Sequence, residues 1–275
     1  MSGGSLVGGS RVDIVLLLGA LLAVYGAGWW RLRRRAPRLT PGWRAGCYLA
    51  SVGAVGLALL SPIDRLAEEL FRAHMIQHLL LIKVAAPALL LANPLPTIIW
   101  GLPRPLRARV GGLLVPGAPI RIAWRALTSM PLTWLIYAFT LWFWHLPVAY
   151  DAALEERFLH DVEHLAFLAA GILFWWPLIL PAPRVRTAVS PGLRVAYLVV
   201  GAFQEALLGL LLVLSPEALY RSYSGVPGQS GITAIEDQAG AGILMWAVGG
   251  AVDMVATIAL LSHTLGNTRR GSGAS

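Results

Sequence analysis

The sequence predicts an all-α membrane protein, a polytopic bundle of about seven transmembrane helices. Hydrophobic residues make up 57% of the 275 residues and charged residues only 13%, with a mean hydropathy of +0.66. This composition is too apolar for a soluble domain of that size. Apolar stretches of about 20 residues, the length that crosses a bilayer as a helix, recur along the chain. They are continuous rather than alternating, which disfavours a β-barrel.

The stretches are expected to form one transmembrane domain, residues 12–262, with spans at about residues 12–30, 43–61, 74–99, 129–146, 160–180, 194–214 and 240–262. The first is expected to be a span and not a cleaved signal, because the basic cluster follows the apolar run instead of preceding it. The third contains Pro87, Pro94 and Pro96 and is expected to kink or unwind toward its far end. Residues 1–11 are expected to be a disordered tail, and residues 263–275 a cytoplasmic tail.

Charge placement predicts an N-terminus outside and a C-terminus in the cytoplasm. Of the 22 basic residues, 16 lie in four segments without acidic residues, at 31–44, 104–125, 184–194 and 269–270. The positive-inside rule assigns these segments to the cytoplasm. The opposite ends hold twelve of the fourteen acidic residues. The net charge of +8 is therefore attributed to topology and to contact with anionic lipid, and nucleic acid is not expected as a partner.

Five of the six histidines fall at the predicted outer ends of three spans, and they are His74, His78, His145, His160 and His164. In each His-x-x-x-His pair the two rings lie on one side of a helix, one turn apart. The pattern predicts a metal site. The single cysteine excludes an internal disulfide and a Cys-x-x-Cys motif. The alternative is that these histidines lie at solvated helix ends and pair with nearby acidic residues, without binding a metal.

Copper is the expected metal. Imidazole suits copper, zinc, iron and nickel, and copper is the strongest divalent competitor among them. Met75 offers a thioether for Cu(I), although a methionine at a helix start is more often a packing residue. The side chains expected to lie next to the ligands, including carboxylates that would hold the ring nitrogens in one tautomer, are Met75, Asp161, Glu163, Asp237 and Gln238.

A second polar set lies deeper in the predicted bundle. Lys83 is nine residues beyond His74, and Glu205 and Asp253 fall near the middle of the sixth and seventh spans. Charges at such depth are costly, so they face the bundle interior as pairs or as functional groups. We expect a structural ion pair, with a proton relay as the alternative.

Three blocks of short motifs follow one another between about residues 40 and 262. They are His74-Met75-Ile76-Gln77-His78-Leu79-Leu80-Leu81 with Ala86-Pro87 and Asn93-Pro94; Trp144-His145-Leu146-Pro147 with Tyr150-Asp151, His160-Asp161-Val162-Glu163-His164-Leu165-Ala166-Phe167 and Phe174-Trp175-Trp176-Pro177; and Leu219-Tyr220, Tyr223, Asp237-Gln238, Gly242 and Met245-Trp246. In order and spacing they resemble the caa3-type cytochrome c oxidase assembly factor family, the seven-span CtaG type of Gram-positive bacteria. In one departure, Ala241 stands where the family pattern has the first of two glycines. We expect this to affect helix packing and not ligand chemistry.

The resemblance implies a non-catalytic role in building a haem–copper oxidase at the bacterial plasma membrane, with oxidase subunits as partners. Together with the histidines it predicts a copper chaperone whose metal site faces the extracytoplasmic side. Three alternatives stay open: a bis-histidine haem protein, a metal or proton transporter that uses the deep polar layer, and a hydrolase in which Glu163 acts as base beside His164.

Overall fold

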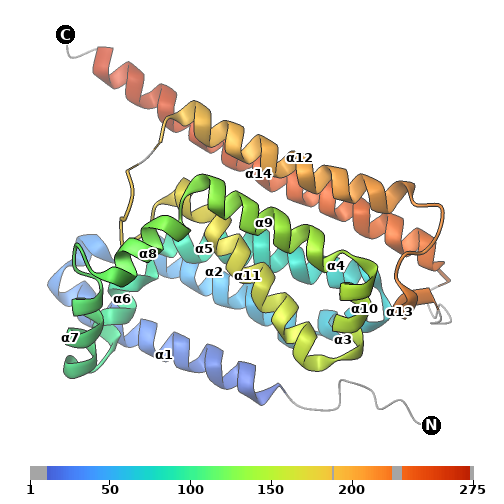
Figure 1. Ribbon diagram of the computed structural model, residues 1–275. Coiled ribbons are helices and arrows are strands. Elements are labelled where there is room, and N and C mark those ends of the chain that lie inside the picture. The colour runs from blue at the N-terminus through green and yellow to red at the C-terminus, as the bar shows by residue number, and fades with distance from the viewer. Residues whose placement is uncertain (1–10, 188, 225–230, 273–275) are drawn as a thin grey trace.

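A computed structural model describes residues 11–187, 189–224 and 231–272, with side chains described as far as Ser262. All regular structure in these ranges is helical, and the helices form an elongated bundle (Figure 1). The predicted fold class is confirmed. The predicted disordered tail lies, apart from Arg11, outside the described residues.

Six helical segments are long and apolar enough to cross a membrane. They are α1 (Val12–Arg35), α2 (Gly42–Leu60), the segment Phe71–Ala92, α11 (Arg157–Ile179), α12 (Pro191–Leu214) and α14 (Ala234–Ser272). A seventh is the pair α8 (Pro119–Leu127) and α9 (Met130–Trp144), which is bent by 65°. The chain is therefore a multi-pass membrane protein with six or seven spans. Helix α14 continues beyond the predicted limit at residue 262.

The third span is irregular, as its prolines predict. It consists of α4 (Phe71–Leu79), a wide π-helical turn at Leu80–Ala85 and α5 (Ala86–Ala92). The wide turn precedes Pro87, whose ring and missing N–H disfavour regular helical bonding one turn earlier. Asn93 then takes a left-handed conformation with φ 48° and ends the helix. Residues 94–99, predicted to belong to this span, instead form a separate helix, α6 (Pro94–Gly101).

Helices α12 and α14 run side by side in opposite directions along one side of the bundle (Figure 1). Their backbones touch where Gly209 meets Gly242, since a Cβ on Gly242 would lie 2.5 Å from the Gly209 carbonyl oxygen. Ala241, the departure from the family pattern, is fully buried beside this contact. The position therefore belongs to helix packing.

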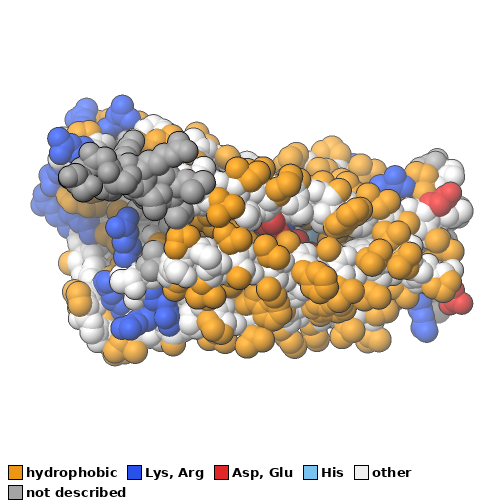
Figure 2. Space-filling model, turned by 90° about the horizontal axis from the view of Figure 1, so that it is seen from above, with side chains coloured by type: hydrophobic (Ala, Val, Ile, Leu, Met, Phe, Trp, Pro, Cys, Tyr) orange, Lys and Arg blue, Asp and Glu red, His pale blue; other side chains and the backbone are white. Residues whose placement is uncertain are grey.

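Short helices close the two ends of the bundle. At one end lie α3 (Pro62–Glu69), α10 (Pro147–Glu155) and α13 (Arg221–Ser224); the other end holds the turn Pro37–Leu39, α7 (Arg104–Leu113) and α8 (Figure 1). Figure 2 shows most basic side chains gathered at one end, an apolar band along the middle, and acidic together with a few basic side chains at the other end. This distribution agrees with the charge pattern of the sequence. The orientation in the membrane stays a prediction.

Candidate metal centre

The five predicted histidines converge at the end of the bundle opposite the arginine-rich loops. Helix α4 carries His74 and His78, helix α11 carries His160 and His164, and His145 directly follows α9. Neighbouring ring centroids lie 4.3 Å (His160–His164), 4.5 Å (His74–His78), 5.1 Å (His74–His160) and 5.3 Å (His74–His164 and His78–His164) apart. The His145 ring is farther away, 6.2 Å from that of His78.

Two overlapping sets of donor atoms emerge from this packing. One set is His74, His78 and His164, and the other is His74, His160 and Glu163. Within each set the donor atoms lie within 4.8 Å of one another, which is close enough for a single ion to be ligated by all three. His74 belongs to both sets. His145 belongs to neither.

Glu163 lies among the histidine rings, closer to them than the sequence predicts. Its side chain has no exposed surface, and its two oxygens lie 3.5 Å from Nε2 of His74 and Nε2 of His78. Neither oxygen accepts a hydrogen bond. From the sequence, Glu163 was expected to accept a hydrogen bond from a ligand histidine. In the structure Glu163 is itself a candidate ligand.

A tyrosine pair determines which nitrogen of His74 carries a proton. Burial raises the pKa values of Tyr150 and Tyr223, so both phenols stay protonated. Tyr223 donates to the carbonyl of Ala67 over 2.8 Å, and its oxygen then accepts from Tyr150 and from Nδ1 of His74, each at 3.4 Å. The proton of His74 is therefore on Nδ1, and the Nε2 lone pair faces Glu163.

The tautomer of His145 follows from a backbone contact. Its Nδ1 lies 2.7 Å from the carbonyl oxygen of Leu141, which only accepts hydrogen bonds. Nδ1 must therefore carry the proton, and Nε2 presents a lone pair that has no partner. Tyr220 reinforces the position by donating to the His145 carbonyl over 3.1 Å.

The centre contains many buried polar atoms that have no hydrogen-bond partner. The side-chain atoms without a hydrogen bond are Nε2 of His74 and His145, both ring nitrogens of His78 and His164, and both oxygens of Glu163. Buried polar groups in proteins nearly always have partners, and each one left alone costs about 1 to 3 kcal/mol. A cation would satisfy several of these atoms at once, so the donor set fits a metal ion.

Two residues that were expected to hold the histidine rings bond the backbone instead. The Asp237 carboxylate accepts from the backbone N–H of Phe71 over 2.6 Å and from Nε of Arg72 over 2.6 Å, which caps the N-terminus of α4. Gln238 bonds the N–H of Leu219 and the carbonyl of Leu212, which fixes the end of α12. Both residues position helices around the centre.

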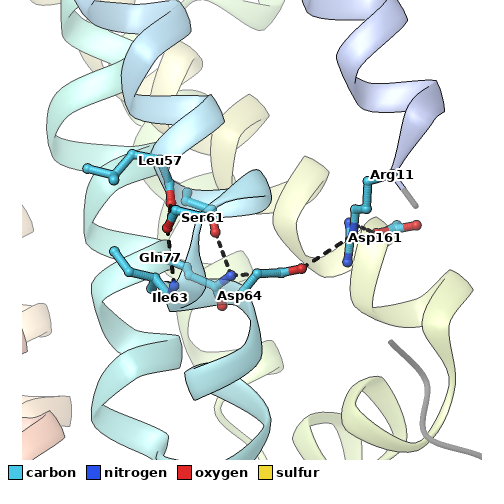
Figure 3. A network of polar contacts seen from close by, with 8 residues as sticks. Arg11, Leu57, Ser61, Ile63, Asp64, Gln77 and Asp161 are labelled. Carbon is cyan, nitrogen blue, oxygen red and sulfur yellow. Dashed lines mark hydrogen bonds and ion pairs between the residues drawn. The ribbon is translucent and has the colours of Figure 1, made fainter. Parts of the chain in front are cut away.

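Asp161 bonds Arg11 in a network of polar contacts beside the centre (Figure 3). Arg11 bonds Asp161 over 2.7 Å and lies 3.5 Å from Asp64. Asp64 accepts from Gln77, whose amide nitrogen also donates to the Ala58 carbonyl. Burial raises the pKa of Asp64, while the Arg11 guanidinium opposes that shift. The network ties the start of α1 to α3, α4 and α11.

Below the centre lies the predicted polar layer. Nζ of Lys83 is 2.8 Å from Oε1 of Glu205 and 2.9 Å from both Asp253 oxygens, and Tyr137 donates to Glu205. Gly249 leaves room for the layer, since a Cβ there would lie 2.8 Å from the Glu205 carboxylate. A cavity of about 10 Å³ separates layer and centre, and its walls include Met75, His78, His145, Lys83, Tyr137 and Glu205.

The comparison that decides the family covers most of the chain. The family described as cytochrome c oxidase caa3 assembly factor (Caa3_CtaG) matches residues 23–266. The chain belongs to this family. Two uncharacterized proteins, from Mycobacterium bovis and Mycobacterium tuberculosis, are each 28% identical over an alignment of 269 positions that covers 92% of this chain. The chain spans 38% of the length of these two relatives. No solved structure matches.

The motifs that carry the resemblance to the caa3 assembly factors meet at the histidine centre. The first block supplies His74 and His78, and the second supplies His145, His160, His164 and Glu163. The third supplies Tyr223. Sequence reasoning missed Tyr150 and Tyr223 as site residues, although both stood in the motifs, because a phenol gives no metal-binding signal until its contact with His74 is seen.

Proposed function

We propose that this chain binds copper at the histidine centre and delivers it to a haem–copper cytochrome c oxidase during assembly. The observation that carries the proposal is the convergence of buried imidazole and carboxylate groups whose polar atoms have no hydrogen-bond partner, at the meeting point of the motifs. The role is non-catalytic. The chain acts in the bacterial plasma membrane, with the centre on the extracytoplasmic side, as the charge pattern predicts.

Copper is favoured by the donor chemistry. Imidazole nitrogens dominate the centre, and among divalent ions copper binds such donors most tightly. Met75 is fully buried next to His74 and borders the small cavity below, within a core of aromatic side chains. Its packing role accounts for its position, and the proposal does not need its sulfur.

The arrangement of the ligands supports release as well as binding. Of the five histidines, only His160 is partly exposed. Because His74 belongs to both donor sets, an ion can pass from His160 and Glu163 toward His78 and His164 while it keeps one ligand. Stepwise ligand exchange of this kind allows transfer to a partner without release of a free ion.

The experiment compares metal content in four proteins purified in detergent: the wild type, a variant with His74, His78, His160 and His164 replaced by Ala, and the single variants Glu163→Gln and His263→Ala. His263 lies near the other end of α14 and serves as control. We expect about one copper per chain in the wild type and the control, and a loss of copper in the fourfold variant. Zinc in place of copper, or equal copper in all four, would overturn the copper proposal.

Delivery is tested separately in cells that carry the fourfold variant in place of the wild type. We expect loss of the copper-dependent oxidase activity while the oxidase polypeptides are still made, and partial recovery when copper is added to the medium. Full oxidase activity in these cells would rule out the delivery role.

The small volume of the cavity at the centre disfavours the haem alternative. The cavity next to His78 and His145 measures about 10 Å³, which holds one water molecule and no macrocycle. An absorption spectrum of the purified wild type checks this, and we expect no Soret band.

A further inference from the structure

A cleft lies at the end of the bundle opposite the histidine centre. It has a volume of about 440 Å³, within the range of small-ligand sites. Helix α1, the end of α6 and the start of α7 form its walls. The lining residues are Trp30, Arg31, Arg34, Arg35, Trp100, Leu102, Pro103, Arg104 and Arg107.

The cleft is strongly cationic. Five of its nine lining residues are arginines and none is acidic. Nothing in the lining neutralises these charges. A planar guanidinium pairs best with an oxyanion that accepts two parallel hydrogen bonds, and phosphate is such a group.

Contacts within the protein hold several of these arginines in place. Arg31 donates to the carbonyl oxygens of Trp100 and Gly101 at 3.2 and 3.0 Å. Arg34 stacks on Trp30 with its guanidinium carbon 3.9 Å from the ring centroid, and Arg107 lies 4.5 Å from the centroid of Trp100. Stacking and backbone bonds reduce the side-chain freedom that a ligand would otherwise have to restrict.

Two glycines fix the spacing of the walls. A Cβ on Gly28 would lie 1.8 Å from the Thr97 carbonyl oxygen, and a Cβ on Gly101 would lie 2.1 Å from the Val24 carbonyl oxygen. The backbones of α1 and α6 are therefore in contact just before the cleft opens. The cleft is a consequence of helix packing and not of mobile surface side chains alone.

The depth of the cleft indicates where its ligand comes from. Helix α1 starts at Val12, and about 20 residues at 1.5 Å each cross the roughly 30 Å of hydrocarbon, which brings Arg31 to the headgroup level. Trp30 is 55% exposed, as expected for an indole at the membrane interface. A ligand in this cleft therefore meets phosphate-binding groups and apolar side chains at the height of lipid headgroups.

We propose that this cleft binds the headgroup of an anionic phospholipid, with preference for one that carries two phosphates, as cardiolipin does. Five arginines match two phosphates better than one, and lipid-binding pockets between helices on the cytoplasmic side have this composition. The site is independent of copper binding, because it lies at the other end of the bundle.

The test is native mass spectrometry of the full chain in detergent, titrated with cardiolipin, phosphatidylglycerol or phosphatidylcholine. The cleft variant replaces Arg31, Arg34 and Arg107 by Gln. A matched control replaces Arg109 of α7, Arg125 of α8 and Arg184 by Gln, and none of these three arginines lines the cleft. Thermal unfolding in the same detergent identifies the variants that are folded, and Arg34→Gln alone replaces the triple variant if the latter does not fold.

We expect the wild type and the control to retain cardiolipin at least tenfold more tightly than phosphatidylcholine, with phosphatidylglycerol between them. The cleft variant is expected to lose that preference. Equal loss in cleft and control variants would mean that bulk charge alone attracts the lipid, and would overturn the proposal. Displacement of cardiolipin by millimolar inorganic phosphate would identify a free-phosphate site and would also overturn it.

Discussion

The hydroxyl of Tyr223 lies 3.4 Å from Nδ1 of His74 and donates its own proton to the carbonyl of Ala67. A residue of the short helix α13 thereby sets the tautomer of the one histidine that both donor sets share. Helix α13 contacts α10, which packs on α11. The loop region between α12 and α14 therefore influences the metal centre although it supplies no ligand.

Replacement of Tyr223 by Phe should weaken metal binding. The variant removes the acceptor for the Nδ1 proton, so that His74 also samples the tautomer whose Nε2 cannot bind a metal. Loss of such an orienting hydrogen bond costs about 10- to 100-fold in metal affinity. A competition titration with a copper chelator measures the change. Tyr197→Phe, which removes a buried hydroxyl that bonds Thr133 and the Phe174 carbonyl, is the control and should leave affinity unchanged.

Glu163→Gln should lower metal affinity and raise the stability of the metal-free protein. The buried carboxylate has no donor, so a neutral amide of the same shape removes a desolvation cost in the absence of metal. With copper present, the loss of the anionic ligand weakens binding. Chelator competition and thermal unfolding with and without copper measure both effects.

Asp161→Asn serves as the control for Glu163→Gln. It removes a carboxylate two positions away on the same helix, one that bonds Arg11 and not the rings. Its metal affinity should equal that of the wild type. Equal copper affinity in the wild type and Glu163→Gln would show that Glu163 is not a ligand.

Metal affinity should also fall in acid, because protons then compete with the metal for the imidazole nitrogens. Burial lowers the pKa of the neighbouring His145 to about 4, so this competition begins well below the ordinary histidine pKa of about 6.5. Copper binding measured at pH 7.5, 6, 5 and 4 should change little above pH 6 and weaken toward pH 4 in the wild type. A binding constant that is still unchanged at pH 4 would argue against imidazole ligands.

The sequence was sufficient to predict that the five histidines lie at the same end of the bundle, because topology places the ends of three spans at one membrane face. Whether their rings converge depends on which helices are neighbours, and residue spacing does not encode that. The sequence was also sufficient to predict that Lys83, Glu205 and Asp253 pair with one another, since three charges at mid-membrane depth have few other partners. Both inferences depend only on position along helices, which hydropathy reveals.

Residues whose role depends on how loops and helix ends meet were not predictable. Asp237 was expected beside the rings, but it caps α4 because α14 begins next to the start of that helix. Arg11, the partner of Asp161, stood in the segment expected to be a disordered tail. For the third span, the prolines predicted a break, and Asn93 determined its place by its left-handed conformation.

Asp237→Ala should destabilise the protein by about 1 to 2 kcal/mol, the usual cost of a lost helix cap. It should also weaken copper binding, because α4 carries His74 and His78 and begins at the capped residue. Thermal unfolding and copper competition measure the two effects. Glu236→Gln alters the neighbouring, exposed acid but keeps a side-chain oxygen that can accept from Thr233, so neither quantity should change. If Asp237→Ala affected stability but not copper affinity, the cap would not position the ligands.

The last prediction concerns the polar layer. Lys83→Met should destabilise the protein by about 3 to 5 kcal/mol, because it leaves the buried carboxylates of Glu205 and Asp253 without a cation. Replacing all three by Met, Gln and Asn should restore most of that loss, since no buried charge then remains. Unfolding in detergent measures the stability of both variants, and oxidase activity in cells measures their function.

The triple variant distinguishes a structural ion cluster from a proton relay. If the layer only neutralises charge, the triple variant should be stable and should support oxidase assembly. If the cavity between Lys83 and His78 serves proton movement, the triple variant should be stable and yet inactive, because the groups that exchange protons have been removed. The short distances from Lys83 to both carboxylates favour the structural outcome, since they place the ammonium between two anions that neutralise it.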